Sequence, residues 1–449
     1  MVNRDEAVEY ALKEARDNDV KFIRLWFADI LGNLKGFAIT VEELESTLTR
    51  GMGFDGSAIE GFARDEEIDL YALPDPNTFS ILPWRPRENA VARMFCDIIT
   101  PDEEPFEGDS RYVLRRNIER AANLGYTYYV GPELEYFYFK NSKSPELLDQ
   151  GGYFDQDATD TSTDLRRETV LMLENLGIPV EQSHHEVSPS QHEIDLRHTD
   201  ALTMADRFVF FRMMANEIAR KHGAFATFMP KPSAQRTGSG AHYNMSLADL
   251  ASGKNLFEVD GEDPHGCGVT PLAYHFIAGV LKHAKAICAV IAPTVNSYKR
   301  LIRKGAMSGS TWAPVFVCYG NNNRTNMLRI PSQGARVECR AADIGCNPYL
   351  GAAMILAAGL EGIRERLEPG QPHRENMYDY SEKDVADMGI ETLPRTLSEA
   401  IDAFEADPLS RQVFGDAMYA AFVDYKRDEW NAYHTHVSDW EIQRYLKFF

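Results

Sequence analysis

Hydrophobic and polar positions along the chain follow two different periods, and together they predict a mixture of helices and strands. Helical spacing marks residues 3–18 and, after a cap at 109–110, a helix that is stopped by Gly125. Four further stretches have helical spacing: 164–176, 200–222, 270–291 and 347–366. Strand-like runs lie at 21–40, 127–139, 192–196, 241–247, 314–319, 326–330 and 336–340. This irregular order favours antiparallel hairpins with inserted helices over a regular βαβ alternation.

A proline- and acid-rich stretch at 100–111 is the best candidate for a domain boundary. The chain before it consists of short extended pieces punctuated by prolines and by the glycine-rich loop at 51–62. We therefore predict an α+β protein, with a small N-terminal domain at residues 1–105 and a large domain at residues 106–449.

Composition narrows the class of protein. The chain has 449 residues and a net charge of −21, so it repels a phosphate backbone, which argues against nucleic acid as a partner. No stretch approaches about 18 consecutive apolar residues, and the charged N-terminus has no apolar signal core, so we expect no membrane span and no secretion. The six cysteines form no CxxC pair, as is typical of reduced thiols in a cytoplasmic protein.

Glu133 and Glu135 lie two residues apart in the strand-like run 127–139, so both carboxylates point to the same face. Two like charges on one face are costly unless water solvates them or a cation compensates them. A solvated face is the ordinary explanation for such a pair. Phe137 and Phe139 share the same parity, however, so we expect this face to be closed to water, which favours a metal site.

Other candidate ligands follow along the chain. Glu186 and Glu193 flank a proline-containing loop, and His242, Asn244 and Ser246 share one face of the strand at 241–247. A lone histidine is more often a structural residue than a ligand. Glu338 would add a fifth carboxylate, and carboxylates with one imidazole suit Mg²⁺ or Mn²⁺. Such ions would let an acidic protein bind nucleotide phosphates.

A set of arginines completes the candidate chemistry: Arg300, Arg324, Arg329 and Arg340. Guanidinium groups bind carboxylates and phosphates and neutralise the charge that develops in phosphoryl transfer, although any one of them could form a surface salt bridge. The sequence has no GxxxxGK[ST] motif, so a P-loop is not expected. Its GxGxxG match, GMGFDG at 51–56, lies in the glycine-rich loop at 51–62 and not in a βαβ unit, so a Rossmann crevice is not expected either.

The ordered set of motifs resembles the glutamine synthetase family, type I, over essentially the whole chain. The motifs are FDGSAIEGF, the E-x-E strand, HHEV…QHEI, ATFMPKP, GSGxH, NSYKR, NR…RIP and RVExR…NPYL. The resemblance implies a β-grasp-like N-terminal domain and a catalytic domain with a curved antiparallel sheet flanked by helices. It implies an ATP-dependent ligase that joins the γ-carboxylate of L-glutamate to ammonia or a small primary amine through a γ-glutamyl phosphate.

The resemblance also implies roles for individual residues. Two Mg²⁺ or Mn²⁺ ions are expected, one held by Glu135, Glu186 and Glu193 and the other by Glu133, His242 and Glu338. The residues expected to bind glutamate are Arg300, Arg340 and Gly238. Those expected near ATP and its transferring phosphoryl group are Ser246, Asn244, Arg324 and Arg329. The amine pocket is expected to contain Asp55, Ser57, Tyr153, Glu186 and Trp312, with Asp55 accepting a proton across a subunit boundary.

The sequence departs from the type I pattern at three positions. In the flap segment LIRKGAMSGSTWAP, Trp312 stands where the family has a glutamate. In the separate segment TGSGAHYN, Thr237 replaces an asparagine and Asn244 replaces a histidine. An indole in place of a carboxylate makes the amine pocket more apolar. The flap and Thr237 are similar to the γ-glutamylmethylamide synthetase (type III) branch, which favours an alkylamine as the acceptor.

Three alternatives stay open. Asp55, Ser57 and Tyr153 match an ammonium pocket, so an ordinary glutamate–ammonia ligase is the main alternative. A non-catalytic member of the fold should have lost ligands or arginines, yet all six ligand positions and all four arginines are present. A different acid substrate is disfavoured because Arg300 and Arg340 are both retained.

The resemblance further implies a homo-oligomer, a dodecamer of two hexameric rings. The C-terminal segment SDWEIQRYLKFF is rich in aromatic residues that would need burial, which is consistent with such an assembly.

Overall fold

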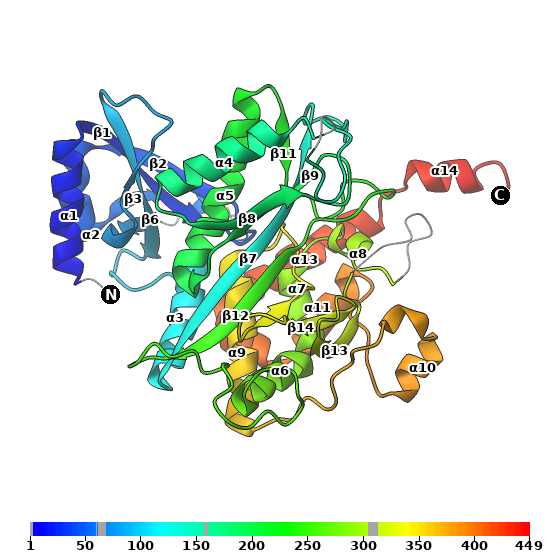
Figure 1. Cartoon of the computed structure of the whole chain (residues 1–449). Helices are drawn as coiled ribbons and strands as arrows, with labels where there is room; N and C mark the ends of the chain where they lie inside the picture. The colour runs from blue at the N-terminus through cyan, green and yellow to red at the C-terminus, as the bar shows by residue number, and fades with distance from the viewer. Residues whose placement is uncertain (1–2, 60, 62–68, 157–159, 304–312) are drawn as a thin grey trace.

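The structure is a computed structural model that describes residues 3–59, 61, 69–156, 160–303 and 313–449 (Figure 1). Its N-terminal part consists of α1 (Arg4–Asp17), β1 (Val20–Ala28), β2 (Leu34–Thr40), α2 (Leu44–Arg50), β3 (Met52–Asp55), β4 (Asp69–Pro74), β5 (Ser80–Ile81) and β6 (Ala90–Ile99). The described strands form a six-stranded sheet in the order β2-β1-β6-β4-β3, with β5 beside β6. Strands β1 and β6 are parallel, and α1 and α2 bury their apolar faces against this sheet.

The second sheet is larger and carries the candidate site. Its strands are β7 (Tyr126–Phe139), β8 (Val180–His185), β9 (Gln191–Leu196), β10 (Thr199–Asp200), β11 (Phe225–Thr227), β12 (Ala241–Asp249), β13 (Phe316–Asn321), β14 (Asn326–Ile330) and β15 (Val337–Cys339). Within the described residues the order is β13-β14-β15-β12-β7-β9-β8, and β10 and β11 pair with β7. The sheet is antiparallel except for the β13–β14 pair.

Helices cover the face of this sheet opposite the site. They are α3 (Ser110–Asn123), α4 (Thr163–Asn175), α5 (Ala201–Lys221), α6 (Pro271–Lys282), α7 (Ala284–Ile291) and α9 (Pro348–Glu365). The short helix α8 (Ser297–Arg300) instead carries Arg300, which lines the site. Tyr136 on β7 packs against Phe211 on α5, with ring centroids 5.5 Å apart. Because neighbouring strand residues point to opposite faces, Glu133 and Glu135 face away from these helices.

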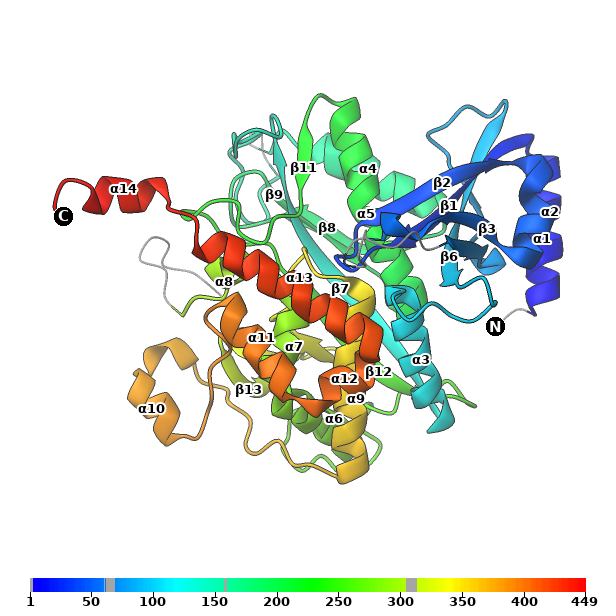
Figure 2. The same ribbon diagram turned by 180° about the vertical axis from the view of Figure 1, so that it is seen from behind.

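The C-terminal part is helical: α10 (Glu382–Asp387), α11 (Leu397–Ala406), α12 (Pro408–Phe414), α13 (Asp416–His434) and α14 (Asp439–Tyr445). The last helix projects away from the body of the molecule in both views (Figures 1 and 2). Trp440, Leu446 and Phe448 expose more than half of their surface there.

The predicted helices at 164–176, 200–222 and 347–366 are confirmed to within a residue or two at their ends. The stretch 270–291 is instead two helices that meet at His283 with a bend of 76°. The imidazole of His283 lies there between Asp407 Oδ2, 2.6 Å away, and Glu361 Oε1, 3.0 Å away. Such long-range contacts are invisible to hydrophobic periodicity. None of the described helices is by itself long and apolar enough to span a membrane.

The buried Arg111 on α3 connects the smaller sheet to helix α5 through ion pairs. Its guanidinium donates to Asp97 at the end of β6 at 2.5 Å, to Asp75 at 2.9 Å and to Asp206 on α5 at 3.0 and 3.1 Å. The side chain is only 2% exposed. One buried cation therefore joins the N-terminal part to the helices that cover the larger sheet.

Candidate active site

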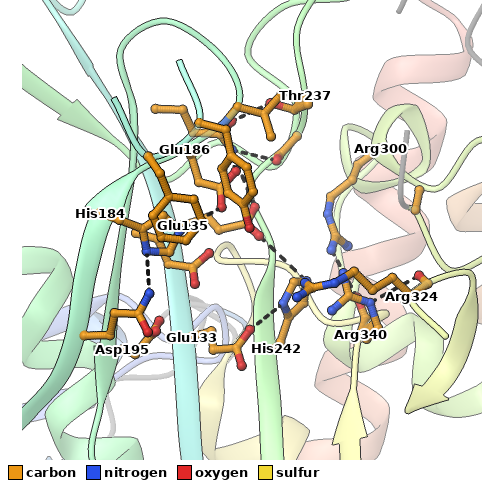
Figure 3. Close-up of a pocket in the computed structure, with 18 of the residues that line it drawn as sticks. Glu133, Glu135, His184, Glu186, Asp195, Thr237, His242, Arg300, Arg324 and Arg340 are labelled. Atoms are coloured by element: carbon orange, nitrogen blue, oxygen red, sulfur yellow. Dashed lines mark hydrogen bonds and ion pairs between the residues drawn. The ribbon is translucent and has the colours of Figure 1, made fainter. Parts of the chain in front are cut away.

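A pocket of about 430 Å³ opens on the face of the large sheet that the helices leave uncovered (Figure 3). Carboxylates from β7, β9 and the β8–β9 turn lie on one side of it, and arginines lie on the other, with His242 between them. The described lining residues that were predicted from the sequence are Glu133, Glu135, Tyr153, Glu186, Glu193, Gly238, His242, Arg300, Arg324, Arg329 and Arg340.

Strand register brings the ligands together. Glu133 on β7 is paired with His242 on β12 and with Asp195 on β9, while Glu135 is paired with Glu193. Residues that are far apart in sequence therefore become nearest neighbours on one face of the sheet.

The first ligand group consists of Glu135, Glu186 and Glu193, which offer oxygen atoms within 4.8 Å of one another. Burial and the nearby Asp195 and Glu135 carboxylates raise the pKa of Glu193 well above its ordinary value. Burial alone would also raise the pKa of Glu186, but hydrogen bonds from His184 and the Val187 N–H lower it. The same group therefore contains one carboxyl whose pKa is raised and one whose pKa is lowered.

The second ligand group consists of Glu133, His242 and Glu338, whose ligand atoms also lie within 4.8 Å of one another. His242 Nδ1 lies 3.0 Å from Glu133 Oε2 and 3.6 Å from Glu338 Oε1. Burial opposes ionisation of Glu133, yet hydrogen bonds from His242 and Asn244 lower its pKa to about 2. Glu338 is fully buried, and its pKa is lowered because Arg340 and Arg329 outweigh the effect of burial.

Both groups suit a hard divalent ion. They offer five carboxylates and one imidazole in adjacent clusters, as Mg²⁺ and Mn²⁺ prefer. Asp195 Oδ1 is buried beside them and has no hydrogen-bond partner among the described residues. Burial and the Glu133 carboxylate raise the pKa of Asp195 well above its ordinary value. This excess of buried negative groups is what a cation would compensate.

Mn²⁺ is expected to stabilise the protein more at pH 8 than at pH 6. Because the pKa of Glu193 is raised above its unfolded value, the folded metal-free protein binds extra protons and loses stability as pH rises through the range above pH 4.5. A bound ion needs the ionised form and removes this repulsion. Thermal unfolding with and without Mn²⁺ at pH 6, 7 and 8 measures the effect, with NaCl at equal ionic strength as the control. An equal Mn²⁺ shift at all three pH values would contradict it.

Arg300 is held by two backbone carbonyls that follow β15 and by a glycine turn. Arg300 is buried and donates from Nη1 to the Ala341 carbonyl at 3.0 Å and from Nη2 to the Arg340 carbonyl at 3.1 Å. A Cβ atom on Gly238 would lie 2.7 Å from Arg300 Cγ and 2.7 Å from the Pro230 carbonyl oxygen. Only glycine therefore lets this turn approach Arg300 so closely.

Several predicted site residues lie elsewhere. Asp55 and Ser57 are in the N-terminal part, where the Ser57 N–H donates to Asp55 Oδ1 at 2.9 Å, and neither is among the described residues that line the pocket. The same holds for Ser246 and Asn244. Glu338 belongs to the second ligand group but is fully buried and is not among the described residues that line the pocket. Asn244 instead donates to Glu133 Oε1 at 2.9 Å and accepts from Arg336 Nε at 2.8 Å. Trp312 lies outside the described residues.

Of the apolar wall beside the first ligand group, Tyr153 was predicted from the sequence, whereas Phe154, Val187 and the neighbouring His184 were missed. Phe154 stacks on the His184 ring with centroids 4.4 Å apart and planes 10° apart, and Tyr153 packs edge-on against Phe154. Tyr153, Phe154 and Val187 line the pocket, and each exposes between 38% and 49% of its surface. His184 lies two residues before Glu186, so strand parity could have indicated it.

A sheet that presents two carboxylate groups opposite four arginines defines a metal-dependent enzyme that handles anionic substrates. The chain belongs to the glutamine synthetase family, because the model of the glutamine synthetase catalytic domain matches residues 107–445 and that of its β-grasp domain matches residues 19–101. This confirms the predicted α+β fold with a β-grasp domain and a catalytic domain. Members are ATP-dependent ligases that form carbon–nitrogen bonds and use Mg²⁺ or Mn²⁺.

Relatives and solved structures agree with this assignment. The glutamine synthetase of Methanosarcina mazei is 43% identical over 98% of this chain and 97% of its own length. That of Clostridium saccharobutylicum is 44% identical over 96% of each. A structure of GmaS in complex with ADP has a TM-score of 0.87 and 36% identity, and covers 97% of this chain and 99% of its own.

Proposed function

We propose that this protein is a glutamate–amine ligase that uses ATP to join the γ-carboxylate of L-glutamate to a small primary alkylamine. The observation that carries the proposal is a single pocket in which two carboxylate groups face four arginines. This arrangement can hold an amino acid, a nucleotide phosphate and a cationic nucleophile together.

The chemistry requires activation of a poor electrophile. ATP transfers its γ-phosphoryl group to the γ-carboxylate of glutamate, and the amine then attacks the carbonyl carbon and displaces phosphate. Divalent ions, when bound, would neutralise the phosphate charge at the two carboxylate groups. Arg300 and Arg340 would hold the carboxylates of glutamate, and Arg324 and Arg329 would neutralise the phosphoryl group in transit. Gly238 would let the amino acid approach Arg300.

Two carboxylate side chains would bind the amine and remove its proton. Alkylamines are cations at neutral pH, so Glu186 would attract the alkylammonium ion, and Asp55 of a neighbouring subunit would accept its proton. Ser57 and Tyr153 would complete this pocket. Ser246 and Asn244 are proposed on the ATP side, Asn244 acting through Glu133, which it contacts.

The apolar wall supports an alkylamine as the acceptor. Tyr153, Phe154 and Val187 present aromatic and aliphatic surface next to Glu186, and a carboxylate beside aromatic rings suits an alkylammonium ion. Ammonia is the second candidate, favoured by the 43% and 44% identity to curated glutamine synthetases against 36% to GmaS.

Phosphate release with Mg²⁺, ATP and L-glutamate, measured against ammonia, methylamine, ethylamine, ethanolamine and putrescine, tests the proposal. We expect kcat/KM for an alkylamine to exceed that for ammonia by at least tenfold, about 1.4 kcal/mol. Replacing Val187 with serine should reduce this ratio by roughly threefold to tenfold, because it removes apolar contact with the alkyl group. Val259→Ser is the matched control, since both valines are 38% exposed but Val259 lies outside the pocket. A higher kcat/KM for ammonia would identify a glutamine synthetase instead.

We further propose domains at residues 1–105 and 106–449, a cytoplasmic location and a dodecamer of two hexameric rings. The exposed apolar side chains of α14, and the absence of Asp55 from the described residues that line the pocket, support an assembly in which neighbours complete the site. Light scattering of the purified protein tests the subunit number. The six buried free thiols suit a reducing compartment.

A further inference from the structure

The turn between β8 and β9 contains two serines, each hydrogen-bonded to a different segment that contributes residues to the pocket. It lies between Glu186 and Glu193, and its residues Ser188 and Ser190 are 5% and 0% exposed. Neither serine lines the pocket, so neither is placed to touch a substrate.

Ser190 fastens the loop at 148–155. Its hydroxyl accepts the backbone N–H of Leu148 at 2.7 Å and that of Asp149 at 3.0 Å, and its own N–H donates to Asp149 Oδ1 at 2.6 Å. Ser190 has a φ of 66°, in the left-handed region that disfavours side chains. A serine at such a position costs free energy, which the two hydrogen bonds to its hydroxyl offset.

The same loop carries the aromatic wall of the amine side. Asp149 Oδ1 also accepts from Gly151 N–H at 3.2 Å and lies 3.0 Å from His185 Nε2. The Phe154 N–H donates to the His185 carbonyl at 3.0 Å. Tyr153 and Phe154 are thus placed beside Glu186 by contacts that begin at Ser190.

Ser188 fastens the glycine turn on the glutamate side. Its Oγ accepts the Thr237 N–H at 2.9 Å and lies 2.6 Å from Thr237 Oγ1, whose own proton goes to Gln191 Oε1. Gln191 Nε2 then donates to the Gly238 carbonyl at 2.9 Å. This directional chain of hydrogen bonds fixes the turn that packs against Arg300.

We propose that Ser188 and Ser190 are separate positioning residues for the two substrates: Ser190 sets the amine wall and Ser188 sets the glutamate wall. The proposal rests on the proposed glutamate–amine ligase activity. The turn from Ser188 to Ser190 would thereby align the amine with the activated glutamate.

Two single variants test the assignment through Michaelis constants. Ser190→Gly removes the hydroxyl while glycine adopts the left-handed backbone without strain. We expect it to raise KM for the amine about threefold to tenfold, with KM for glutamate within about twofold of the wild type. Ser188→Ala should give the converse, a threefold to tenfold higher KM for glutamate and an unchanged KM for the amine. Ser188→Thr keeps the hydroxyl and should restore KM for glutamate.

Circular dichroism and KM for ATP, both unchanged, would show that the variants fold. The proposal would be overturned if either variant raised KM for glutamate and KM for the amine equally. It would also be overturned if neither variant raised either constant. Absence of phosphate release by the wild type with glutamate and every amine would instead refute the proposed function, and the positioning roles with it.

Discussion

Glu133→Gln is expected to lower kcat for phosphate release by about 1000-fold, equivalent to roughly 4 kcal/mol of lost transition-state stabilisation. Glu133 is held as an anion, with its pKa lowered to about 2 by His242 and Asn244 against the effect of burial. An amide of the same shape cannot supply this negative charge to a divalent ion. Initial rates at saturating glutamate, ATP and amine, titrated with Mg²⁺ or Mn²⁺, measure the loss.

The variant also separates a ligand role from a structural one. If Glu133 is a ligand, Glu133→Gln should lose much of the Mn²⁺-induced thermal stabilisation. The metal-free variant should also lose some stability, because the lowered pKa of Glu133 means that its partners favour the charged form in the folded state. Glu119→Gln on the exposed surface of α3 is the matched control and should change neither quantity. Full activity of Glu133→Gln would contradict the assignment of the second ligand group.

Arg111→Met is expected to lower the free energy of unfolding by about 3–5 kcal/mol, because it leaves the buried Asp206 carboxylate without its cation. Asp206 is buried and receives two hydrogen bonds from Arg111, and Asp97 and Asp75 receive one each. The midpoint of urea unfolding at fixed protein concentration measures the change.

Arg115→Met is the internal control for this prediction. Arg115 contacts the same Asp97 carboxylate at 2.8 and 3.0 Å, but its side chain is 31% exposed. Solvent screens such a pair, so its loss should cost less than about 1 kcal/mol. Equal effects of the two substitutions would show that burial of Arg111 does not govern the junction between the smaller sheet and α5.

The local pattern of the chain predicted most elements that carry the site. Residues two apart in a strand share a face, which correctly placed Glu133 with Glu135 in the pocket. Caps and stops predicted α5 and α9 almost to the residue. The bend at His283 and the five C-terminal helices were missed, since both depend on packing against distant segments rather than on local periodicity.

Motif order, beyond periodicity, predicted five of the six proposed ligand residues and all four arginines among the residues that line the pocket. It could not place Asp195 beside Glu133, because strand register between β7 and β9 is set by long-range pairing. Nor could it show that the Thr237 hydroxyl donates to Gln191 and is therefore committed within the protein.

By itself, then, the sequence determined the family, the strand faces and the set of charged groups, because these follow from residue type and from the fixed periods of helix and strand. Only the tertiary structure decided which charged groups become neighbours and which of them are buried. It also decided how Ser188 and Ser190 bond the segments that carry the two walls of the pocket. Those properties depend on contacts between residues far apart in the chain, and the free energy of a buried charge or hydrogen bond depends on all of its neighbours together.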